Sequence, residues 1–128
     1  GRVPVPRGWV VERASRGACR SLPAAASGLA ASHPSDYTLV LRALRWGGPG
    51  LARAVLACPG AVAAAAGEGA GPSYSRRFER LGVDVTARAV ALERPGESLL
   101  LEVEAPTAKL VIVEGLFDRW VEGVKRGE

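Results

Sequence analysis

The sequence TAKLVIVEGLFDRWVEGVKR, at residues Thr107–Arg126, carries the clearest secondary-structure signal in the chain. Its larger apolar side chains recur every three or four residues, which is the spacing of one face of an α-helix. The members of this stripe are Leu110, Val113, Phe117, Trp120 and Val124. Pro106 suits the position before the first turn, because its missing N–H costs little there, and Gly127 provides a stop. We therefore predict a helix with this stripe in the core.

Two further apolar residues of the same helix, Ile112 and Leu116, point well away from the stripe, because each residue turns the helix by about 100°. Ala108 and Gly123 lie beside them. A helix that is apolar on two sides either lies deep in a core or contacts two different elements. Its second side packs either against an earlier helix of this chain or against a partner, and the sequence leaves both alternatives open.

Upstream of this helix, Val83–Leu92 and Ser98–Ala105 alternate apolar with polar or small side chains, and a Pro-Gly pair lies between them. Alternation with a period of two is typical of strands with one buried face, so these segments predict a β-hairpin whose outer face carries Glu102 and Glu104. Earlier in the chain, Tyr37–Leu44 is rich in β-forming side chains and predicts a third strand.

The other segments complete the predicted order of elements. Leu51–Ala57 predicts a helix, which Pro59 interrupts, and the alanine-rich Ala61–Ala66 predicts a short continuation. We interpret Glu68–Pro72 as a loop and Ser73–Arg80 as a polar connection. The order strand, helix, strand, strand, helix predicts an α+β fold with two layers, in which a three-stranded antiparallel sheet carries both helices on one face.

The first 35 residues differ from the rest of the chain. They hold four prolines, an Ala/Ser-rich run and five arginines, and they predict a basic, irregular arm, with residues 36–128 as a single compact domain. The net charge is +4, and residues 1–53 carry a net +6 while the remainder carries −2. A basic first half either binds an acidic surface such as nucleic acid or forms a solvated face.

Composition excludes several classes of function. Cys19, Cys58 and the single histidine, His33, are too few and too scattered for a metal centre or a catalytic triad, so we predict no enzyme, cofactor or metal. We expect both cysteines to be free thiols in a reducing compartment. Without an apolar run of about 18 residues or a signal peptide, the chain is predicted to be cytoplasmic and outside the membrane. The absence of Met, Asn and Gln fits either a thermophile or a GC-rich genome.

Arginines supply the candidate contacts with nucleic acid. They are Arg45, Arg76, Arg77 and Arg80, and the last three lie in SYSRRFER beside Tyr74 and Phe78. Arginine pairs with phosphate, and an aromatic ring can stack on a base. Equally, the same aromatic rings can fold back onto the core.

Sequence features near the ends of the predicted helices and strands resemble those of a known family. An alanine-rich helix closes with a proline at Ala52–Pro59, the last strand of the hairpin ends in alanine at Glu97–Ala105, and the final helix has a late Trp120–Val121 pair. From about Asp36 to Arg126, this arrangement resembles the small dimerisation subunit of the KEOPS complex, an archaeal and eukaryotic assembly that makes threonylcarbamoyladenosine on tRNA.

The resemblance implies a non-catalytic scaffold that forms a homodimer and holds the transferase subunit of that complex. On this interpretation, Ile112, Leu116 and Gly123, with Arg119, contact the partner, and the arginines guide tRNA through salt-sensitive phosphate contacts. Two other functions remain open. One is a stand-alone RNA- or DNA-binding α/β protein that uses the basic N-terminal half, and the other is a small enzyme or ligand-binding domain with an unrecognised pocket.

Overall fold

A computed structural model of the protein describes residues 3–64 and 71–127. In chain order the elements are β1 (Val10–Arg13), β2 (Ser27–His33), β3 (Asp36–Gly47), α1 (Leu51–Leu56), β4 (Ala61–Val62), β5 (Ser73–Arg80), β6 (Val83–Arg94), β7 (Glu97–Pro106), a 3-10 turn (Thr107–Lys109) and α2 (Leu110–Lys125). The predicted loop at Glu68–Pro72 and the end of the predicted helix at Ala61–Ala66 lie largely outside the described residues. The start of that helix is instead the short strand β4.

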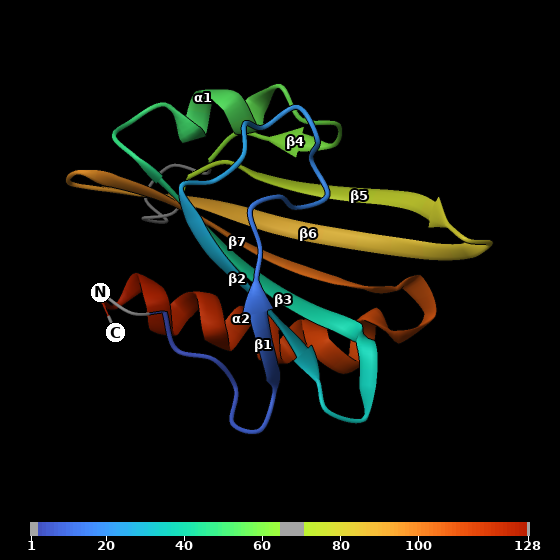
Figure 1. The fold of residues 1–128 in the computed structure, drawn as a ribbon. Coiled ribbons are helices and arrows are strands. Elements are labelled where there is room, and N and C mark those ends of the chain that lie inside the picture. The colour runs from blue at the N-terminus through green and yellow to red at the C-terminus, as the bar shows by residue number, and fades with distance from the viewer. Residues whose placement is uncertain (1–2, 65–70, 128) are drawn as a thin grey trace.

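The described strands form one seven-stranded sheet in the order β1-β2-β3-β7-β6-β5-β4, and every neighbouring pair is antiparallel. Helix α2 covers one face of this sheet and α1 lies over the other (Figure 1). The general α+β class fits, but the predicted three-stranded sheet with both helices on one face is wrong. Strands β1, β2, β4 and β5 were absent from the predicted sheet, and the helices are on opposite faces.

The long hairpin of β6 and β7 confirms the strand prediction, and its register determines what each helix covers. Leu99, Leu101 and Val103 of β7 face α2, where they pack in one cluster with the predicted helical stripe. Leu100 faces the opposite side and packs in a second cluster beneath α1, together with small side chains of β6. Those small side chains are Ala87, Ala89 and Ala91. Both faces of the hairpin are therefore covered.

The segment predicted as a polar connection, Ser73–Arg80, is strand β5. Its Tyr74 is only 2% exposed and belongs to the cluster beneath α1, while Ser75 and Arg77 alternate onto the other face. Charged residues occupy both faces of this strand, so its sequence lacks the contrast between an apolar and a polar side that identifies a strand.

The N-terminal segment was predicted to be irregular, but it contributes β1 and β2 to the sheet. Strand β2 has the sequence SGLAASH, and its small side chains carry little β-forming signal. Burial against β3 compensates for this, because Ala31 is fully buried and Leu29 packs on the α2 cluster. Before β1 the chain runs along α2, where the Nε1–H of Trp120 donates to the carbonyl oxygen of Pro4 at 2.5 Å.

Residues 14–26, which join β1 to β2, form a segment that we call the strap. The strap crosses the α1 face of the sheet, and its Cys19 forms a disulfide with Cys58, just after α1. The prediction of two free thiols is therefore wrong. Cysteines separated by 39 positions gave no spacing motif from which their pairing could be recognised.

Candidate functional site

A network of charged side chains lies on the α1 face of the sheet, and its centre is Glu102 of β7. This carboxylate is fully buried beneath the strap. Its Oε1 accepts a hydrogen bond from Arg42 Nη1 at 2.6 Å, and its Oε2 accepts from the backbone N–H of Ala18 at 2.9 Å and from the hydroxyl of Tyr74. A Cβ atom on Gly17 would lie 2.9 Å from the carboxylate oxygens, so glycine allows this close approach.

The neighbours of Glu102 determine its chemistry. Burial, and then the charge of Glu102, raises the pKa of Tyr74 far above its ordinary value, so this phenol stays neutral and donates its hydrogen bond. Burial lowers the pKa of Arg42, but the charges of Glu102 and Glu104 outweigh that effect and keep the guanidinium protonated. With three recorded donors and no exposure to solvent, Glu102 is placed to hold the strap against the sheet.

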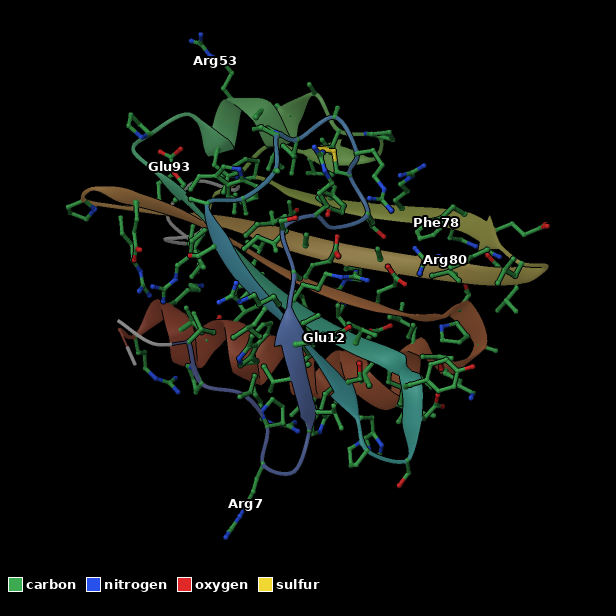
Figure 2. The ribbon with its side chains drawn as sticks, viewed as in Figure 1. Arg7, Glu12, Arg53, Phe78, Arg80 and Glu93 are labelled. Carbon is green, nitrogen blue, oxygen red and sulfur yellow. A yellow bond between two sulfur atoms is a disulfide. The ribbon has the colours of Figure 1, made fainter. Side chains whose placement is uncertain are left out.

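The network continues from Glu102 toward the uncovered end of the sheet. Glu104 is 4% exposed and accepts from Arg42 Nη1 at 2.9 Å and from Arg80 Nη1. On β5, Arg80 and Arg76 both lie over the ring of Phe78, at 5.2 and 5.1 Å from its centroid. Figure 2 shows Phe78 and Arg80 on that strand. Two arginines, Arg42 and Arg80, thus pair with the two carboxylates, while Arg76 donates to a backbone carbonyl oxygen instead.

The prediction that Glu102 and Glu104 lie on a solvated outer face is wrong. They alternate with residues that face α2, as expected, but their own side of the sheet is covered by the strap and lined by Arg42. Arg42 is 60 positions away in the sequence, so no local pattern could identify it as the partner. The apolar run Leu99–Leu101 was a usable signal, because consecutive apolar residues in a strand indicate burial on both faces.

The residues predicted to bind a partner all lie on α2, where they range from half-buried to exposed. Ile112 is 65% exposed and its neighbour Val111 is 79% exposed. Leu116 and Gly123 are half-buried, and Arg119 is exposed. Leu116 packs partly against the core cluster. Because α1 lies on the opposite face of the sheet, the chain's own first helix does not cover Ile112.

The four arginines predicted to bind nucleic acid do not share one surface. Arg76 and Arg80 lie on the α1 face of β5, where Arg76 Nη1 donates to the carbonyl oxygen of Ala18 at 2.5 Å. Arg77 lies on the other face of that strand and pairs with Asp84. Arg45 of β3 lies 3.9 Å from Glu97, near the far end of the sheet. Each arginine has an acceptor within the chain, and nucleic-acid binding stays a prediction.

His33 is the single histidine of the chain. It is the last residue of β2, where its Nδ1 accepts from the N–H of Ser35 and its ring makes a T-shaped contact with Trp9, 5.4 Å between centroids. Residues 3–64 and 71–127 contain no group of three side chains that could hold a metal ion. Neither helix in this part of the chain is long and apolar enough to cross a membrane.

Comparison with known proteins gives information on the fold alone. No family model and no curated protein matches this chain. A similar solved structure is a crystal structure of a protein from Bacteroides thetaiotaomicron VPI-5482, with a TM-score of 0.51 and 12% sequence identity. The match covers 76% of this chain and 35% of that protein, so the chain corresponds to a part of that larger molecule.

Proposed function

We propose that this protein is a non-catalytic binding subunit that holds a protein partner on the outer face of α2. The outer face is the surface formed by Val111, Ile112, Gly115, Leu116 and Arg119. The observation that carries the proposal is the exposure of Ile112 and Val111, at 65% and 79% of their surfaces, on a helix whose opposite side is core. Adjoining exposed apolar side chains are typical of interaction surfaces.

Gly115 gives independent support. It lies inside α2 without a positive φ, where glycine is less favourable than alanine by about 1 kcal/mol. A Cβ atom there would meet only the end of the Arg119 side chain, at 3.4 Å. The fold of the described chain therefore does not require glycine at this position. A small residue between Ile112 and Arg119 would instead let a partner approach the helix backbone closely.

The specific role implied by the sequence is a scaffold subunit of the tRNA-modifying KEOPS complex, with a second copy and the transferase as partners. This role is supported by the sequence features near the ends of the helices and strands. The structure adds the exposed Ile112, which suits such a contact. In chain order, β4 and β5 come between α1 and the β6–β7 hairpin. The five elements on which the resemblance rests are therefore interrupted by two further strands.

The disulfide bears on where such a subunit would act. Disulfides persist in oxidising compartments, and intracellular proteins of hyperthermophiles also contain them. A cytoplasmic location agrees with the Cys19–Cys58 disulfide only in the second case. The predicted cytoplasmic location therefore requires a hyperthermophilic source, which is one of the two explanations of the composition.

The oligomeric state tests the proposal. At micromolar concentration, size-exclusion chromatography with light scattering should give the mass of a dimer for the unmodified protein and of a monomer for Ile112→Asp, because a charge on this face prevents apolar contact. Leu56→Asp is the matched control, since Leu56 is a half-exposed apolar residue of α1 on the opposite side of the sheet. A monomer for the unmodified protein would contradict self-association through this face.

A further inference from the structure

A cleft at the uncovered end of the α1 face has the features of a ligand site. It has a volume of about 270 Å³ and lies between the start of β3 and the β5–β6 hairpin, with the end of β7 as its floor. The residues that matter below are Tyr37, Val40, Arg80, Leu81, Val85 and Pro106. Its volume is near the lower limit for sites that bind small molecules.

The inner end of the cleft is charged and held in place. Arg42 and Arg80 line it on either side of Glu104, and Phe78 supports the guanidinium of Arg80 from beneath. A guanidinium carries five N–H donors in a planar fork. The recorded contact of Arg80 with Glu104 uses Nη1 alone, and the Arg80 side chain is 46% exposed. Arg80 therefore lines the cleft with N–H donors that the contact with Glu104 does not use.

The walls and the rim of the cleft are apolar. Val40, Val85 and Pro106 form the walls. At the rim, Tyr37 is 81% exposed, Leu81 is 99% exposed and Val83 is 47% exposed. A ligand whose anionic group binds Arg80 would thus place its apolar part against these walls and leave the cleft between β3 and the hairpin. Charge at one end and apolar surface at the other match an amphipathic ligand.

The backbone of Leu81 points to the same function. Leu81 and Gly82 form the tip of the hairpin, with φ values of 50° and 81°. Such turns favour Asn followed by Gly, because other side chains strain the backbone at positive φ. Leu81 is strained, is almost completely exposed and packs on neither core cluster. Residues in strained backbone conformations cluster at functional sites, which makes the exposed Leu81 side chain a candidate for contact with a ligand.

We propose that this cleft binds a small amphipathic carboxylate, with its carboxylate on the free side of the Arg80 guanidinium and its apolar chain against Val40, Val85 and Leu81. Arginine suits this role because its fork matches the two oxygens of a carboxylate. The charged side chains that line the cleft are Arg42, Arg80 and Glu104, two cations against one carboxylate, so an anionic ligand complements them. This site is separate from the outer face of α2 and does not depend on the proposed partner.

Sodium octanoate is the probe, with 1-octanol and octylammonium as ligands of matched chain length. Calorimetry should give octanoate a Kd on the order of 1 mM or lower, and amide resonances of β3, β7 and the hairpin should shift. Arg80→Gln should weaken binding at least about tenfold through loss of the forked contact. Arg53→Gln removes the same charge from α1, where Arg53 extends into solvent (Figure 2), and should change nothing.

Thermal melting will show whether Arg80→Gln lowers stability. If it does, a second variant, which is expected to stay folded, tests the site. Leu81→Asn should weaken octanoate binding roughly threefold while keeping or raising the melting temperature, since Asn suits the turn. The proposal would be overturned if octanoate shifted no resonance of the cleft. It would also be overturned if octanol bound as tightly as octanoate, or if Leu81→Asn and a folded Arg80→Gln both bound octanoate like the unmodified protein.

Discussion

Replacing Glu102 with alanine should lower the free energy of unfolding by about 3–5 kcal/mol, the range for breaking a buried ion pair by removing one partner. The change leaves the Tyr74 hydroxyl and the Ala18 N–H without their acceptor, and Arg42 keeps one carboxylate instead of two. Because Ala18 belongs to the strap, its protection against hydrogen exchange should also fall. Urea unfolding followed by circular dichroism measures the loss.

Glu12→Ala is the matched control for this prediction, because Glu12 is an exposed residue of β1 and its loss should change stability by less than about 0.5 kcal/mol. Glu102→Gln should fall between the two, since an amide retains acceptor capacity for Ala18 and Tyr74 but lacks the charge that faces Arg42. A loss below about 1 kcal/mol for Glu102→Ala would show that the carboxylate does not hold the strap.

The double substitution of Cys19→Ala and Cys58→Ala should lower the free energy of unfolding by about 4 kcal/mol. The reason is the length of the closed loop, since the two cysteines are 39 positions apart and the disulfide restricts the unfolded chain accordingly. Both side chains are buried, so alanine avoids placing a new hydroxyl in the core. Urea unfolding in the absence of reductant compares this variant with the unmodified protein.

Thiol titration provides the control for the disulfide. The unfolded, unreduced protein should show no free thiol, because both cysteines of the chain are in the disulfide. After reduction, the unmodified protein should approach the stability of the double variant. Two free thiols before reduction, or equal stability of the unmodified protein and the variant, would contradict the proposed linkage of the strap to α1.

The parts of the fold that sequence analysis predicted are those whose signal is local. The stripe of α2 and the hairpin of β6 and β7 both repeat an apolar period within one segment, and both are present. Strand β3 and helix α1 were also predicted from their own composition. Such patterns report which side of an element is apolar, but they do not report on which face of a sheet a helix will lie.

The parts that were missed depend on partners distant in sequence. Strand β2 is buried because β3 lies beside it, although its own side chains are mostly small. From the sequence alone, Glu102 resembles a solvated glutamate, because its partners Arg42, Tyr74 and the strap are distant in the chain. The candidate surfaces divide in the same way. The apolar outer face of α2 was visible from helical spacing, whereas the cleft requires β3, β7 and the hairpin to be assembled.

The central claim is that α2 has an inner face that holds the fold and an outer face that is free for a partner. Urea unfolding of Ile112→Asp beside Val113→Asp tests it most directly, since these neighbours differ in exposure, at 65% and 2%. We predict that, at a protein concentration where the unmodified protein is a monomer, Ile112→Asp stays within about 0.5 kcal/mol of it, while Val113→Asp loses at least about 3 kcal/mol. A loss for Ile112→Asp as large as that for Val113→Asp would show that the outer face is core and would contradict the claim.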